Sequence, residues 1–272
     1  MPKLAITPVS REQLRRMSGI PPIDGEALDF IKEYRLVFNP STCAYDTERT
    51  ERYVYITVDE RVLKRNGDGF TIRFGKIEGT FDCSDKGLVS LKNAPLVVTE
   101  GFHCEKNKLK TLEFSPKKVY LDFTCYNNGL ETLFGAPQRI GRHFHCEYNH
   151  LKTLEHAPNS VCGDFSCVRN ELESLEGSPT YVGGDFRCDW NKLKSLKSTT
   201  ETIVGSLYCT NNKLETLQHT PIRIGKNIVC YKNPLKSIEL RGTALGFLGS
   251  VIAIDPSEFD PPNMIWSEKF TV

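Results

Sequence analysis

Cysteine recurs in this chain at a fixed interval of 21 residues, eight times in succession. We call these the ladder cysteines and number each repeat from its own cysteine: Cys83, Cys104, Cys125, Cys146, Cys167, Cys188, Cys209 and Cys230. A constant interval of this length is typical of a solenoid, in which each repeat adds one turn. One repeat alone has no partner for its apolar side, whereas stacked repeats bury it against each other.

Each repeat carries the same residue types at the same distances from its cysteine. Position −2 holds a large apolar residue, position +5 holds Leu, and position +8 holds Leu or, in the last repeat, Ile238. Position +3 is Asn in seven repeats and Lys86 in the first. Position +12 is Pro in six repeats, and position +15 is Val or Ile in the first seven.

This order of residues predicts a short strand, a turn and a return segment in every repeat. Positions −2 and 0 alternate with polar positions, as expected for a strand with one buried face. Pro favours an extended, unpaired return segment, and the Gly that usually follows permits the turn into the next strand. We therefore expect a β-rich solenoid with one parallel sheet, in which the Asn residues form an internal ladder that binds the backbone of neighbouring turns.

The motif F-x-C-x-x-N-x-L-x-[ST]-L-x-x-x-P resembles the signature of leucine-rich repeats, L-x-x-L-x-L-x-x-N-x-L. It looks like the short bacterial subclass, and closer still to Cys-containing repeats of tailed-phage and bacterial proteins. The resemblance covers residues 79–240 and implies a leucine-rich-repeat-like fold. Two departures stand out, since Cys replaces an aliphatic residue and the leading aliphatic residue sits one position early. Bacterial effectors of this type can carry a ubiquitin-ligase domain, and nothing in this chain matches one.

The sequence divides into three regions. Residues 1–78 do not repeat and are interpreted as a small α+β N-terminal cap or domain, residues 79–240 as the solenoid, and residues 241–272 as a C-terminal cap and tail. In the first region the sequence predicts a short helix after Ser10, a helix from Glu26 to about Tyr34, a strand over 52–58 and a hairpin over 61–74. The aromatic tail at 263–272 either folds back on the cap or docks on a partner.

Charge and hydropathy restrict the class of protein. Lys and Arg number 35 against 34 Asp and Glu, which argues against a nucleic-acid binder and against a polybasic membrane module. The longest apolar run, 244–254, is far shorter than the ~20 residues of a membrane span. With no signal peptide recognisable near Met1, we expect a cytoplasmic protein, or a virion component if a phage encodes it.

Ten cysteines raise the alternatives of disulfides or a metal site. In-register strands lie ~4.8 Å apart with parallel side chains, whereas a disulfide needs Cβ atoms ~3.8 Å apart on convergent vectors. The chain also lacks a C-x-x-C pair. We expect reduced, buried ladder cysteines that act as small apolar side chains, with Cys43 and Cys162 as the exceptions. No cofactor or metal is predicted.

The side chains that point outward from the sheet are the candidate binding residues, because repeat proteins commonly bind through this open face. Aromatic and Arg side chains, which dominate binding hot spots, gather in its central and C-terminal part. The predicted partner-binding residues are Tyr126, Tyr148, Arg169, Arg187, Trp190 and Tyr208. Asp122, Asp164 and Asp185 at position −3 add a negative stripe along one edge. A solvated face with chance aromatics is the alternative.

Catalysis and metal binding have weaker support. His103, His143 and His145 share the open face, so a zinc site or a catalytic base is conceivable there. The chain has no nucleophile elbow, phosphate loop or H-E-x-x-H motif. The first hypothesis is a non-enzymatic protein-binding module, such as a phage-encoded host-directed factor. The alternatives are a structural component of a virion or other particle that contacts neighbours through its termini, and an enzyme with its site in residues 1–78.

Overall fold

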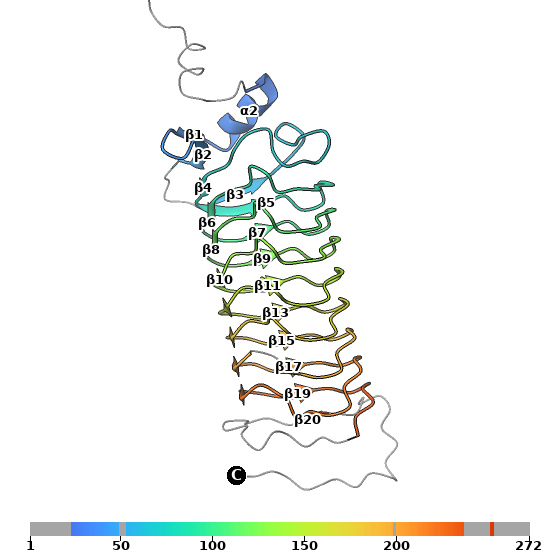
Figure 1. Cartoon of the computed structure of the whole chain (residues 1–272). Helices are drawn as coiled ribbons and strands as arrows, with labels where there is room; N and C mark the ends of the chain where they lie inside the picture. The colour runs from blue at the N-terminus through green and yellow to red at the C-terminus, as the bar shows by residue number, and fades with distance from the viewer. Residues whose placement is uncertain (1–22, 49–52, 198–199, 237–250, 253–272) are drawn as a thin grey trace, which may run out of the picture.

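The chain forms a β-solenoid of stacked parallel turns, seen in a computed structural model as a rod whose N-terminal end carries, within the described residues, one helix and a small hairpin (Figure 1). The structure describes residues 23–48, 53–197, 200–236 and 251–252. The expected fold class is confirmed. The expected helix after Ser10 and the C-terminal tail lie outside the described residues.

A ten-stranded parallel sheet, the large sheet, contains positions −2 and −1 of every repeat. Its strands are β3 (Val54–Thr57), β5 (Gly79–Asp82), β7 (Phe102–His103), β9 (Phe123–Thr124), β11 (Phe144–His145), β13 (Phe165–Ser166), β15 (Phe186–Arg187), β17 (Leu207–Tyr208), β19 (Ile228–Val229) and β20 (Val251–Ile252). Neighbouring repeats pair in register, so equivalent residues lie side by side, as Phe144 and Phe165 do.

A second parallel sheet, the small sheet, corrects the expectation of a single sheet with an unpaired return segment. It consists of β4 (Lys76–Ile77), β6 (Val97–Val98), β8 (Lys118–Val119), β10 (Arg139–Ile140), β12 (Ser160–Val161), β14 (Tyr181–Val182), β16 (Thr202–Ile203) and β18 (Arg223–Ile224). Position +15 recurs at the same height in every turn, and its apolar side chain is buried, as in Val161. Return segments held in register can pair their backbone groups, and the Pro lies before the paired residues.

The interior consists of columns of identical positions. The rings of Phe123 and Phe144 stack with centroids 5.3 Å apart, and Phe144 and Phe165 continue the column at 5.6 Å. All eight ladder cysteines are buried and unpaired, whereas Cys43 and Cys162 are exposed, as expected. Burial raises the pKa of thiols such as Cys146 well above its ordinary value. The seven ladder cysteines from Cys83 to Cys209 are therefore packing groups and poor nucleophiles.

The Asn ladder is also present. Asn149 Oδ1 accepts the backbone N–H of Leu130 at 3.0 Å, and its amide donates to the carbonyls of Cys125 and Cys146, both at 3.1 Å. One side chain thus joins two successive turns and satisfies backbone groups that the core would otherwise leave unpaired.

The N-terminal cap contains a further, degenerate turn, which corrects the interpretation that nothing before residue 79 repeats. Val54 pairs with Gly79, 25 residues on, whereas Lys76 pairs with Val97, 21 residues on. Between its strand in the large sheet and its strand in the small sheet, this degenerate turn therefore has four more residues than a regular repeat. The spacing of Ile56, Val58 and Leu63 matches positions −2, 0 and +5, but the motif is hard to recognise in the sequence because position 0 is not Cys and position +3 is not Asn.

The predicted helix is confirmed as α2 (Gly25–Glu33), whose N-terminus is capped by Asp24 through a 2.7 Å bond from the Ala27 N–H. The hairpin of β1 (Leu36–Asn39) and β2 (Ala44–Thr47) follows it. The strand predicted over 52–58 is β3. The hairpin predicted over 61–74 is reduced to one antiparallel bridge between Leu63 and Phe70, because the neighbouring turn pairs with this backbone instead.

Arg61 joins α2 to the first turns of the solenoid. Its guanidinium contacts Asp59 at 2.6 Å and Glu33 at 2.7 Å and lies over the Phe30 ring. Arg61 occupies the place that Asn takes in later turns. It lowers the pKa of Asp59 by hydrogen bonding.

Candidate functional site: the open face of the large sheet

The open face consists of the outward side chains at positions −3, −1, +1 and +2 of each repeat. Position +2 follows the strand and has a left-handed backbone in every repeat, with φ between 53° and 57°. Asn and Asp tolerate this conformation best among non-glycine residues, and bulky side chains raise its cost. Asn127 and Asn211 follow that preference, but Tyr148, Arg169 and Trp190 do not. Three large side chains therefore stand where the backbone alone would favour Asn.

Tyr148, Arg169 and Trp190 form a continuous stack on the open face. The Cζ of Arg169 lies 5.5 Å from the Tyr148 ring centroid and 4.5 Å from that of Trp190. The two aromatic side chains remain about half exposed, at 54% and 49%. A guanidinium held between two rings presents a rigid, amphipathic surface, because each contact restricts the rotamers of all three side chains.

The other three predicted residues lie on the same face in two different settings. Arg187 lies over the Tyr208 ring, with its Cζ 4.7 Å from the ring centroid, and forms a smaller stack. Tyr126 stands apart and is only partly exposed. Burial, with Glu105 and Glu147 in the turns on either side, raises the pKa of Tyr126 above its ordinary value. The structure therefore brings together five of the six residues in two stacks and leaves Tyr126 among carboxylates.

Three turns of the open face carry a base and an acid on either side of their cysteine. The turns of Cys104, Cys146 and Cys188 carry a base at −1 and an acid at +1, in the pairs His103/Glu105, His145/Glu147 and Arg187/Asp189. The Nδ1 of His145 lies 2.8 Å from Glu147 Oε1, and this hydrogen bond raises the pKa of His145.

The carboxylates of Asp189 and Glu147 differ in how many hydrogen bonds they accept from the protein. Asp189 accepts the Thr210 N–H at 2.8 Å and its hydroxyl at 2.7 Å, yet burial raises its pKa. Glu147 Oε2 is buried and has no hydrogen-bond partner among the described residues. The Glu147 carboxylate therefore retains acceptor capacity that the described part of the chain does not use.

Position −3 forms a second hydrogen-bond ladder that the sequence analysis did not predict. Its side chain accepts the backbone N–H of position −3 in the following turn, as Asp164 Oδ1 does from Asp185 at 2.7 Å. Asp122, Asp185 and Ser206 make the equivalent bond to the following turn. The predicted negative stripe is therefore also a structural device, and only the tendency toward Asp and Ser at −3 could have indicated it.

The three histidines of the open face have separate partners. His143 Nδ1 accepts the Asp164 N–H at 2.9 Å and so belongs to the −3 ladder. His103 Nδ1 lies 2.8 Å from the Thr124 hydroxyl, which donates to Glu105. His145 contacts Glu147. No cluster of three His, Cys, Asp or Glu side chains suited to a metal ion occurs within the described ranges.

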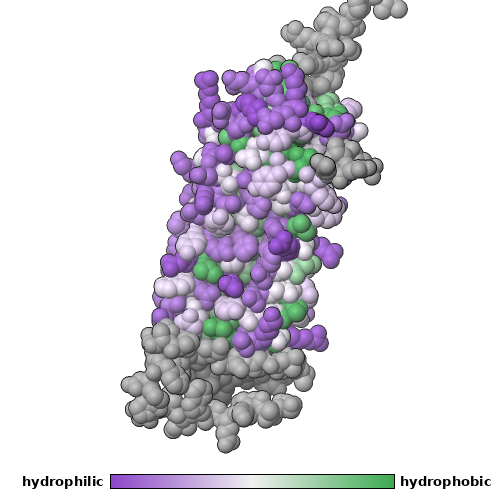
Figure 2. Space-filling model, turned by 180° about the vertical axis from the view of Figure 1, so that it is seen from behind, coloured by the Kyte–Doolittle hydropathy of each residue, from purple (hydrophilic) through white to green (hydrophobic). Residues whose placement is uncertain are grey.

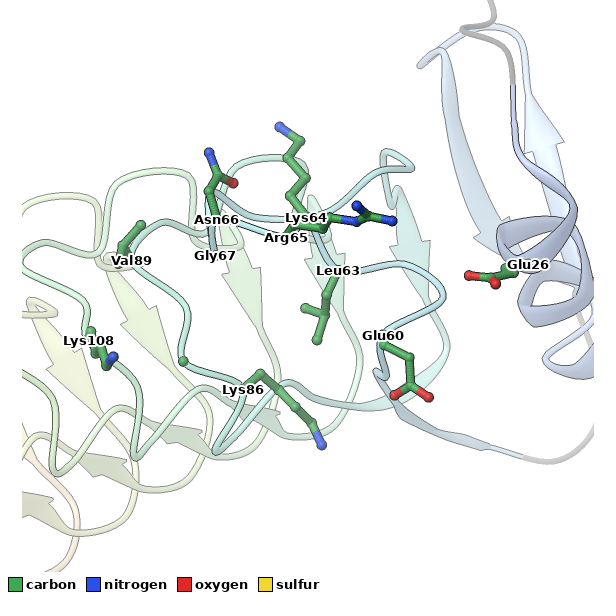
Figure 3. Close-up of a pocket in the computed structure, with 11 residues that line it drawn as sticks. Glu26, Glu60, Leu63, Lys64, Arg65, Asn66, Gly67, Lys86, Val89 and Lys108 are labelled. Atoms are coloured by element: carbon green, nitrogen blue, oxygen red, sulfur yellow. The ribbon is translucent and has the colours of Figure 1, made fainter.

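An open groove of about 590 Å³ lies at the other end of the array, between the degenerate turn and the first repeats. Figure 3 shows Arg65 and Glu26 pointing toward each other across it, with Leu63 between the loops that form its walls. Lys64, Lys86 and Lys108 add positive charge, and Glu60 adds negative charge. Because both acidic and basic side chains line the groove, its charge does not indicate a particular class of ligand.

The face of the molecule that Figure 2 displays is predominantly hydrophilic, with hydrophobic residues as separate spots. The part of the chain that the structure describes contains no helix able to cross a membrane. No known family matches the sequence, and no curated protein matches it. The fold defines the class of protein as a parallel β-solenoid with a helical N-terminal cap.

Proposed function

We propose that this protein is a non-enzymatic interaction module that binds a partner protein through the open face of its solenoid. The observation that carries the proposal is the stack of Tyr148, Arg169 and Trp190 in left-handed backbone positions. Large side chains at these positions cost conformational energy. Aromatic and Arg side chains are also the types that dominate binding hot spots.

The resemblance of the repeats to those of tailed-phage and bacterial proteins supports a specific setting. In that setting the protein is a leucine-rich-repeat-like, phage-encoded factor that acts on a host protein in the host cytoplasm. The rigid rod supports this role, since a preformed surface loses little conformational entropy on binding.

The test is affinity purification from the native source with the wild type and a Tyr148/Arg169/Trp190 triple alanine variant. A matched control replaces Tyr120 and Tyr181, which are exposed at 55% and 40% outside the open face. We expect one partner to be retained by the wild type and the control and lost by the triple variant. The purified partner should then bind the triple variant at least ~30-fold more weakly, as for a hot spot of ~2 kcal/mol or more. Retention of the same partner by all three proteins would exclude the open face.

A further inference from the structure

An acid followed by an aromatic residue occurs in two turns of the open face, with one turn between them. Glu147 precedes Tyr148 in one turn, and Asp189 precedes Trp190 two turns later. Turns of a parallel sheet lie ~4.8 Å apart, so these two acid–aromatic pairs are separated by ~9.6 Å along the axis. A ligand that lies along the axis therefore meets the same pair of chemical groups twice, at points ~9.6 Å apart.

One backbone conformation matches this interval. A polyproline II helix has three residues per turn and a rise of ~3.1 Å per residue, so that every third side chain recurs on one side after ~9.3 Å. A β-strand repeats its facing side chains after two residues, or ~6.7 Å, and an α-helical turn measures ~5.4 Å. Neither of these intervals corresponds to the two-turn interval.

The excess of negative charge on the open face favours a ligand with basic side chains. From Thr80 to Lys232 the four outward positions hold eight carboxylates and four Lys or Arg side chains, although the whole chain is nearly neutral. Glu147, one of these carboxylates, also pairs with His145 through its Oε1 atom. Exposed aromatic side chains beside acids suit a proline-rich segment, whose rings pack on the aromatics while its cations meet the acids.

We propose that the partner presents a proline-rich, cationic segment in the polyproline II conformation, with Lys or Arg at every third residue. The segment lies along the solenoid axis, its prolines against Tyr148 and Trp190 and its cations beside Glu147 and Asp189. This inference rests on the proposed function, because it names the chemistry that the open face recognises.

The probe is a fluorescent peptide that repeats Pro-Pro-Lys, and the readout is its anisotropy on titration with the full-length protein. A second peptide of the same composition has its lysines consecutive, so that it keeps the charge and loses the period. A third replaces Lys with Glu. We expect the periodic lysine peptide to bind at least ~10-fold more tightly than the clustered one, and the glutamate peptide not to bind.

Two protein variants locate the binding. Glu147→Gln and Asp189→Asn remove charge and keep the side-chain volume, and together they should weaken the periodic peptide at least ~10-fold. Glu155→Gln removes one charge from an exposed position outside the open face and should leave the affinity unchanged. Thermal melting of each variant shows that it is folded.

The outcomes separate this inference from the proposed function. Equal binding of the periodic and clustered peptides, or binding unaffected by the paired acid variants, overturns the assignment of the ligand. Absence of peptide binding overturns it too, and the proposed function then stands if the triple alanine variant still loses its natural partner. If the triple variant keeps that partner, the proposed function itself is wrong.

Discussion

The guanidinium carbon of Arg169 lies 4.5 Å from the centroid of the Trp190 ring, one turn further along the solenoid. The two residues are 21 positions apart in sequence and meet only because successive turns stack in register. Such a contact at an exposed site is worth ~0.5–1 kcal/mol. The stack therefore stabilises the arrangement of the surface more than it stabilises the fold.

A double-mutant cycle tests this contact. We expect a coupling free energy of ~0.5–1 kcal/mol between Arg169→Ala and Trp190→Ala, measured by urea unfolding followed by circular dichroism. Each alanine variant keeps the left-handed backbone at the substituted position. The strain energy of that backbone therefore enters the single and the double variants equally and cancels in the coupling free energy. Lys106→Ala, four turns from Trp190, provides the control pair and should be additive within ~0.5 kcal/mol. A coupling no larger than the control would exclude a stable stack.

The Asn ladder predicts a large effect of one buried side chain. Asn149→Ala removes the acceptor of the Leu130 and Asn128 N–H groups, and it removes one of the two Asn amide donors to each of two cysteine carbonyls. Buried groups left unpaired cost ~1–3 kcal/mol each, and relaxation or water entry reduces the total, so that we expect a loss of ~2–4 kcal/mol in the free energy of unfolding. Asn159→Ala, at an exposed position, should change it by no more than ~0.5 kcal/mol. Equal unfolding midpoints for the two variants would contradict the structural role of the ladder.

Thiol reactivity distinguishes the two kinds of cysteine. Burial raises the pKa of thiols such as Cys125 and Cys146 and also blocks access to them. In the native protein, iodoacetamide should label Cys43 and Cys162 rapidly and the eight ladder cysteines only after a denaturant is added. Mass spectrometry of the peptides gives the sites. Rapid native labelling of Cys146 would mean that the turns open far more often than a packed solenoid permits.

His145 provides a pH-dependent test of the open face. The hydrogen bond to Glu147 raises the pKa of His145, which should therefore exceed the ordinary ~6.5 in an NMR titration and fall in Glu147→Gln. Because the folded-state pKa is the higher one, the protonated pair stabilises the fold fully below the unfolded-state pKa. That stabilisation disappears as the pH rises through the folded-state pKa. Identical titration curves in wild type and variant would show that the pair does not form.

The candidate site was only partly predictable from the sequence. The alternation of side chains along a strand is sufficient to place Tyr126, Arg187 and Tyr208 on one face. The stacking of Arg169 between Tyr148 and Trp190 depends on the left-handed backbone that follows each strand, and strand alternation does not describe that backbone. The ladder at position −3 was missed because it uses Asp, His, Ser and Thr interchangeably as acceptors.

By itself, the sequence determined the solenoid, its eight turns, the buried columns of Phe, Leu and Cys, and the Asn ladder. A repeat of constant length places equal residues at equal heights, and these must then pack or pair with their own copies. The tertiary structure decided what depends on contacts between different segments. Backbone pairing of the return segments made the small sheet, and the register of β3 with β5 revealed a turn at residues 54–77 that has Val58 in place of the cysteine and Arg61 in place of the Asn at +3.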